Sequence, residues 1–185
     1  NDAERLQILD RGWDRLSTPQ REQALALVQS RADSAHEASD RDLVLHILKR
    51  AIGDSSARVR ETAYGVIKRL PGFWQSTTAP EFVNAALADD TPAIRALGLS
   101  LAAARSSFWN RDDAVEHLTR LLVDPDEAVR ASALEIVKHH RLAALHPQVA
   151  RRVKVLTKDP ALVSRALGLL RGAGLDPDEI GRAHV

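Results

Sequence analysis

The chain has 185 residues, of which 44% are hydrophobic and 28% charged, and this balance excludes an intrinsically disordered chain. It carries 26 basic and 25 acidic side chains, a formal charge of +1, and no cysteine, which excludes disulfides, thiolate metal sites and a cysteine nucleophile. No apolar run approaches the roughly 18 residues of a membrane helix.

The composition and first residues of the chain indicate a piece of a larger protein. The sequence contains no methionine and begins Asn1-Asp2-Ala3, from which we expect a fragment or processed form. Its many alanine and arginine residues favour a bacterial source. We expect a soluble protein and favour the cytoplasm as its compartment.

Two amphipathic helices are predicted at the start of the chain. Residues 2–16 carry apolar side chains on one helical stripe, which includes Leu6 and Trp13. A second helix follows and reaches about residue 30, with Val28 on its inward face. Residues 30–42 are small and polar, so we predict a surface loop there.

Further helix pairs are predicted along the rest of the chain. Apolar residues fall on one face of each helix, and no pair can bury that face alone, so neighbouring pairs must stack. The first helices are predicted at 42–52, 80–88, 112–123 and 147–158, and the second helices at 55–70, 91–105, 125–140 and 160–172. The aligned apolar columns of the first helices are Leu48, Val83, Leu118 and Val153; Ala51, Ala86, Leu121 and Leu156; and Ile52, Leu87, Leu122 and Thr157. Those of the second helices are Val59, Ile94 and Val129; Ala63, Gly98 and Ala133; Val66, Leu101 and Ile136; and Ile67, Ala102 and Val137.

An Asp and an Arg recur at a fixed interval of 35 residues, which is typical of a repeat array. The Asp positions are Asp54, Asp89, Asp124 and Asp159, and the Arg positions are Arg60, Arg95, Arg130 and Arg165. We interpret Asp124 as a helix N-cap followed by Pro125 at the first helical position. Each Arg is predicted to bridge to the Asp of a neighbouring pair, so that the two columns form a structural ladder. The alternative is a row of exposed guanidinium groups that binds phosphate.

The last helix pair departs from the pattern. Asp159 and Arg165 keep the 35-residue register, but Gly168 and Arg171 fall in apolar columns. Val163, Leu167 and Leu170 indicate instead that the apolar face is displaced by one residue.

Two aromatic pairs also repeat at the 35-residue interval. Phe73-Trp74 and Phe108-Trp109 each follow a second helix. We interpret them as plugs between helix pairs, because architecture must repeat whereas a binding site need not. The alternative is an exposed anchor for a partner or a stacked base.

Positive charge is concentrated late in the chain. Between Lys138 and Arg171 there are eight basic residues and one acid, a net charge of +7, which leaves −6 for the remainder. An acidic protein, a nucleic acid or a phosphate could bind there, although we favour a solvated face or a contact with an acidic neighbouring domain. The candidate partner-binding residues are Lys138, His139, Arg141, Arg151, Arg152, Lys154 and Lys158.

Residue patterns for catalysis or metal binding are not found in the sequence. His139 and His140 are adjacent and would point about 100° apart on a helix, which is a poor metal pair. The glycine-rich and serine motifs of nucleotide-binding proteins and hydrolases are missing. We therefore expect no enzyme activity, no cofactor, and no catalytic, cofactor-binding or metal-binding residue.

The repeated residues resemble those of a known family. Asp54 with Val59-Arg60 and Ala63, and the equivalents that begin at Asp89 and Asp124, resemble the second helix of a HEAT repeat. The resemblance extends from about residue 17 to residue 171. It implies a right-handed α–α superhelix that binds proteins, with the first helices outside and the second helices along the concave side.

The sequence thus predicts an all-α solenoid of about four to five HEAT-like helix pairs in one domain, residues 1–185. The expected repeat boundaries are 1–30, 41–70, 80–105, 112–140 and 147–172, with 173–185 as a truncated repeat or tail. The expected function is protein–protein interaction or scaffolding through the concave face, with a protein or a neighbouring domain of the same chain as the partner. The alternative is a nucleic-acid-binding protein that resembles the HEAT-like alkylpurine DNA glycosylases.

Overall fold

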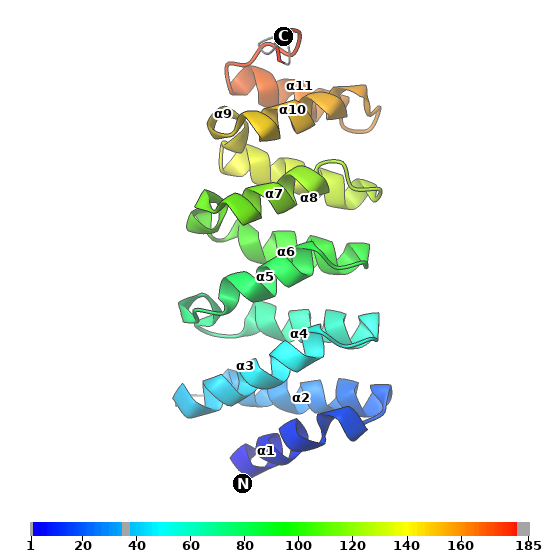
Figure 1. Ribbon diagram of the computed structural model, residues 1–185, viewed down its shortest axis with the longest axis vertical. Helices are drawn as coiled ribbons and strands as arrows, with labels where there is room; N and C mark the ends of the chain where they lie inside the picture. The colour runs from blue at the N-terminus through cyan, green and yellow to red at the C-terminus, as the bar shows by residue number, and fades with distance from the viewer. Residues whose placement is uncertain (1, 35–37, 181–185) are drawn as a thin grey trace. The chain divides into compact units, whose positions relative to one another are not determined.

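The computed structural model describes residues 2–34 and 38–180, and every regular element within those ranges is helical (Figure 1). The all-α class expected from the sequence is therefore confirmed for this part of the chain. No helix in it has both the length and the apolarity needed to cross a membrane. The chain divides into two compact units, the first ending at Ala86 and the second beginning at Leu87.

Unit 1 is built from antiparallel helices in two rows, in which α2 packs on α4 and α1 packs on α3 (Figure 1). Tyr64 joins α4 to the next helix, because its hydroxyl donates to the carbonyl of Phe82 on α5 at 3.0 Å. The elements are α1 (Asp2–Gly12), η1 (Trp13–Arg15), α2 (Thr18–Ser34), α3 (Ala38–Ile52), α4 (Ala57–Arg69), η2 (Phe73–Gln75) and α5 (Ala79–Leu87), whose last residue belongs to unit 2.

The loop predicted at residues 30–42 is wrong for most of its length. Helix α2 continues to Ser34 and α3 already begins at Ala38, while residues 35–37 lie outside the described residues. The reason is that Ala32 lies one helical turn after Val28 and is buried with it, so the apolar face of α2 extends beyond residue 30. The boundary between the first two predicted repeats moves accordingly.

Unit 2 repeats the two-row arrangement. Helix α8 packs on α6 and on α11 in one row, and α7 packs on α10 in the other (Figure 1). The elements are α6 (Pro92–Ala103), η3 (Ser106–Asn110), α7 (Asp112–Leu121), α8 (Glu127–His139), α9 (Leu142–Leu145), α10 (Pro147–Val155), η4 (Leu156–Lys158) and α11 (Val163–Gly172).

The predicted apolar columns form the core of each unit. Leu48 and Val83 in unit 1, and Leu118 and Val153 in unit 2, have no exposed surface. Every residue of the predicted second-helix columns in α4, α6 and α8 is buried as well. The burial prediction is confirmed except at Ile52 and Thr157, which are half-buried, and it shows that the 35-residue interval corresponds to one helix pair in these helices.

Helix α11 follows a different register from the earlier second helices. Its buried positions are Ala166 and Leu170, preceded by the buried Leu162, whereas Val163 and Leu167 are half-buried. These buried residues lie 33 residues after Val129, Ala133 and Val137, so the apolar face is displaced by two residues. The predicted displacement of one residue is wrong. Keeping the 35-residue register would have placed polar Ser164 and charged Arg171 in the core, which is unfavourable.

Each repeated Asp forms a turn ahead of its helix. The Oδ1 atom of Asp124 accepts the N–H of Asp126 at 2.9 Å, and Asp54, Asp89 and Asp159 likewise accept the N–H two residues later. The interpretation of Asp124 as the N-cap is wrong: the N-cap of α8 is Asp126, whose side chain accepts the N–H of Val129 at 3.0 Å. The turn leaves the second carboxylate oxygen of the repeated Asp available to a side chain.

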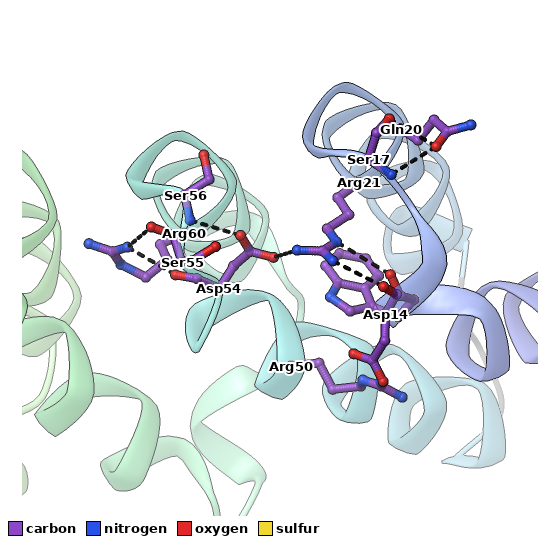
Figure 2. Close-up of polar contacts among 10 residues, drawn as sticks. Asp14, Ser17, Gln20, Arg21, Arg50, Asp54, Ser55, Ser56 and Arg60 are labelled. Atoms are coloured by element: carbon purple, nitrogen blue, oxygen red, sulfur yellow. Dashed lines mark hydrogen bonds and ion pairs between the residues drawn. The ribbon is translucent and has the colours of Figure 1, made fainter.

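Arginines from the preceding helix pair reach that second oxygen. In unit 1, Nη1 of Arg21 donates to Oδ2 of Asp54 at 2.7 Å (Figure 2). In unit 2, Arg95 binds both carboxylate oxygens of Asp124 through Nε and Nη2, at 2.7 Å each. Arg130 donates from Nε to Oδ2 of Asp159 at 3.1 Å. These contacts join consecutive second helices within each unit.

Arg60, Arg95 and Arg130 also hold the turn at the start of their own helix. The Nη1 atom of Arg60 donates to the carbonyls of Asp54 and Ser55, at 2.9 and 3.3 Å (Figure 2). The equivalent bonds of Arg95 and Arg130 are 2.8–3.0 Å long. Arg95 and Arg130 therefore satisfy carbonyls in their own turns as well as binding along the row.

Candidate functional site

A groove opens in unit 2 where α8 and α11 lie next to each other in the row of second helices. Its volume is about 520 Å³, within the usual range for ligand sites. The lining comes from the C-terminal half of α8, from the α9 segment and from α11 along its whole length. The lining residues are Glu135, Val137, Lys138, Arg141, Ala144, Ser164, Arg165, Gly168, Leu169, Gly172 and Ala173.

The groove is open partly because the aromatic plug of the earlier helix pairs is missing. Phe73, Phe108 and Trp109 are buried, which confirms the plug for these rings, and Trp74 is half-buried. The ring of Trp109 lies 6.2 Å from that of His140, between the ends of α6 and α8. Thirty-five residues later the sequence has Ala143-Ala144, and Ala144 lines the groove. A small side chain thus stands where an indole fills the preceding gap.

Glycines in α11 widen the groove further. A Cβ atom added at Gly168 or at Gly172 would meet no atom within 4 Å. Glycine in the middle of a helix destabilises it by roughly 0.5–1 kcal/mol relative to alanine. Packing does not require Gly168, so its presence leaves open space at a cost in helix stability.

Three cationic side chains line the groove, and one carboxylate opposes them. Lys138, Arg141 and Arg165 are exposed, as is Glu135, so the lining carries a net charge of +2. Within the described residues, none of the three cations forms an ion pair or a side-chain hydrogen bond. These charges are therefore free to bind a ligand.

The backbone of Arg141 is in the left-handed region, with φ 57° and ψ 30°. Among the described residues with side chains other than hydrogen, this is the only positive φ. A residue with a Cβ is strained there by about 1 kcal/mol or more. After α4 the chain makes the corresponding turn with Gly72, at φ 68°. After α8 an arginine takes that conformation and presents a guanidinium group to the groove.

The structure separates the predicted partner-binding residues into two groups. Lys138 and Arg141 line the groove, whereas His139 is exposed outside it, with its ring against that of His140 at 4.8 Å. The remaining predicted residues lie on α10 and η4 and do not line it: Arg151, Arg152, Lys154 and Lys158. Lys154 is engaged elsewhere, since its Nζ donates to the carbonyl of Ile180 at 2.5 Å.

Arg165 belongs to the groove, and its assignment to the ladder is not supported by any contact. The displaced register of α11 puts Val163, not Arg165, in the position equivalent to Arg130. Two residues correspond to a rotation of about 200° around a helix, so Arg165 points to another face. The sequence held the signal, because Ser164, Gly168 and Arg171 did not fit the apolar columns.

The two histidines at the end of α8 are not equivalent. His140 is half-buried, and its Nε2 donates to the carbonyl of Ala103 at 3.2 Å. Burial lowers the pKa of His140, the hydrogen bond to Ala103 raises it, and the neighbouring His139 lowers it further. His140 thus joins the ends of α8 and α6 rather than serving the groove.

The groove offers charge and apolar contact together. Leu169 and Ala144 supply apolar surface beside the cations, an arrangement suited to binding an amphipathic anion. No cluster of three or more potential metal ligands occurs among residues 2–34 and 38–180. A scan of protein-family models finds no match to this chain, and searches of curated proteins and of solved structures find none either.

Proposed function

We propose that this chain is a non-catalytic binding module of the helical-repeat type, which holds a protein partner against the row of second helices. The observation that carries the proposal is the groove between α8 and α11, where three cations lie without partners among the described residues. The carboxylates that recur in the sequence have a structural use instead, since Asp54, Asp124 and Asp159 each bind a backbone N–H and an arginine.

The proposal includes a superhelical arrangement that resembles HEAT repeats. It is supported by the 35-residue interval and by the arginine–aspartate bonds that join consecutive second helices inside each unit. In such an arrangement α2, α4, α6, α8 and α11 line the inner side, where partners bind in repeat proteins. Small-angle X-ray scattering tests this arrangement, because a right-handed solenoid and two independently placed units give different distance distributions.

A selection from a random peptide library on the immobilised protein tests the binding function. The matched control is the Gly168→Leu variant, in which the added side chain enters the groove without meeting any described atom at its Cβ. We expect peptides that are enriched on the original chain and lost on the variant. Enrichment that is equal on both proteins, or no enrichment at all, contradicts the proposal.

A parallel titration with duplex DNA tests the nucleic-acid alternative. Phosphate contacts make protein–DNA affinity fall steeply with salt concentration. Tight binding of DNA that disappears with added salt and with Gly168→Leu would replace the protein partner with a nucleic acid.

A further inference from the structure

The cations of the groove come from three places in the chain. Lys138 is in the last turn of α8, Arg141 precedes α9, and Arg165 is in the first turn of α11. Elsewhere in the row, Arg95 and Arg130 each bind a carboxylate and two backbone carbonyls. In the groove, no described residue supplies a carboxylate to Lys138, Arg141 or Arg165. Guanidinium groups bind carboxylates through paired, charge-assisted hydrogen bonds, so this set is suited to a ligand that carries more than one carboxylate.

The strained conformation of Arg141 is a second, independent observation. The turn after α4 shows that glycine satisfies the same backbone geometry, with Gly72 at φ 68°. Non-glycine residues in the left-handed region occur preferentially at functional sites. Backbone hydrogen bonds with Lys138 and Ala144 hold this turn, but the side chain of Arg141 binds no described residue and places a guanidinium group at the groove.

The rest of the lining fits a peptide chain. Gly168 and Gly172 leave open space above α11, which allows a ligand backbone to approach closely. Leu169 and Ala144 provide apolar contact for one uncharged side chain of such a peptide. The volume of about 520 Å³ is suited to a short segment of a few residues.

A nucleic acid fits the groove less well. Single strands are usually held by aromatic side chains on which the bases stack, and no aromatic residue lines the groove. Trp13 and Trp109 are buried, at 3% and 0% exposure. The exposed cations of α10 and η4 lie outside the groove and do not extend it into a track for phosphates.

The geometry points to an acidic peptide segment, with one apolar side chain between carboxylates, as the ligand of the groove. This inference rests on the proposed binding function and specifies its ligand. The carboxylates pair with Lys138, Arg141 and Arg165, and the apolar side chain contacts Leu169 and Ala144.

The experiment is a nuclear magnetic resonance titration of the whole chain with three probes. The first is a short peptide in which Leu is flanked by Glu and Asp residues, the second is the same peptide with Gln and Asn in their place, and the third is a single-stranded oligonucleotide. Millimolar concentrations of the acidic peptide are expected to shift the amide signals of Lys138, Arg141 and Gly168. The neutral peptide is expected to bind at least tenfold more weakly, because it loses the charge-assisted hydrogen bonds.

Two variants separate binding from stability. Arg141→Gly removes the guanidinium group and also relieves the backbone strain, so affinity is expected to fall about tenfold while the melting temperature stays the same or rises. Gly168→Leu is expected to abolish binding, again without loss of stability. Arg152→Ala is the matched control, since it removes an exposed cation from α10 outside the groove and is expected to leave affinity within about twofold.

The outcomes distinguish the acidic ligand from the proposed binding function. If the neutral peptide binds in the groove as tightly as the acidic one, the acidic ligand is wrong and the proposed binding function stands. If the oligonucleotide shifts these signals at lower concentration than the peptide, the ligand class is wrong. If no probe shifts them, the acidic ligand is overturned, and the library selection then decides the fate of the binding function separately.

Discussion

The contact between α6 and α8 and the contact between α8 and α11 use equivalent positions of the repeat but differ in how well their side chains are buried. In the first, Arg95 binds Asp124 through two hydrogen bonds of 2.7 Å, and Trp109 closes the gap between the helix ends. In the second, the equivalent Arg130 and Asp159 are also paired, but both side chains are 18% exposed, and Ala144 stands at the aromatic position. Further along, the apolar face of α11 is displaced by two residues, so Arg165 does not take the position of Arg130 and its guanidinium group is exposed at the groove.

Of the substitutions considered, Arg95→Ala is expected to lower the free energy of unfolding most, because it breaks the buried pair with Asp124. Arg95 and Asp124 are 9% and 7% exposed, and removing the arginine leaves a buried carboxylate without its partner. Breaking a buried pair costs about 3–5 kcal/mol. Urea unfolding should show this loss, whereas Arg165→Ala should leave the free energy of unfolding unchanged within about 0.5 kcal/mol. A comparable loss in both variants would contradict the distinction between the paired Arg95 and the unpaired Arg165.

Arg130→Ala is expected to give an intermediate result. Its bond to Asp159 is longer, at 3.1 Å from Nε, and both side chains are 18% exposed, so water screens the pair. The variant also loses the bonds from Nη1 to the carbonyls of Asp124 and Pro125. We expect a loss of about 1–2 kcal/mol in urea unfolding, between the results for Arg95→Ala and Arg165→Ala. A loss as large as that of Arg95→Ala would show that exposure does not rank these contacts.

The sequence was sufficient for the regular part of the fold. Period, helix faces and the burial of residues such as Leu118 and Ala133 follow from apolar spacing alone, because each helix pair must bury one face. Residues 30–42 were misjudged because their small side chains conceal a helix that continues to Ser34. Local polarity is a weak guide where alanine carries the apolar face.

The groove could be predicted only in part. The positive charge beyond Lys138 drew attention to this region, and both Lys138 and Arg141 line the groove. Arg165 was assigned to the ladder because its number fits the 35-residue interval, yet burial of Leu162 and Ala166 sets the helix in another rotation. The strain at Arg141 depends on a backbone angle that residue type alone does not reveal.

Gly168→Ala is expected to have a smaller effect of opposite sign, because it should raise the free energy of unfolding. The added Cβ meets no atom within 4 Å, and alanine favours the helix over glycine by up to about 1 kcal/mol. We expect a gain of that size in urea unfolding. The same substitution at Gly72, where φ is 68° and an added Cβ would lie 2.9 Å from Oε1 of Gln75, is expected to destabilise the protein instead. Destabilisation by Gly168→Ala would mean that the groove is closed in solution.

The smallest expected effect is a dependence of the stability of unit 2 on pH, which arises from its half-buried histidines. Burial lowers the pKa of His140 and also that of His117, where the nearby Arg120 adds to the lowering while Asp113 and Glu116 oppose it. Because these pKa values are lower in the folded state, the unfolded chain takes up more protons as the pH falls. The stability from these neutral histidines is therefore present above the unfolded pKa of about 6.5 and is lost as the pH falls below it.

Urea midpoints measured between about pH 7.5 and about pH 5 check this expectation. The midpoint of the original chain should fall with pH more steeply than that of His140→Gln, whose amide can still donate a hydrogen bond to the carbonyl of Ala103. Adding His117→Gln should flatten the dependence further. Equal slopes in all three proteins would contradict the burial of these imidazoles. In that case the link between α6 and α8 would rest on the Arg95–Asp124 pair without a contribution from His140.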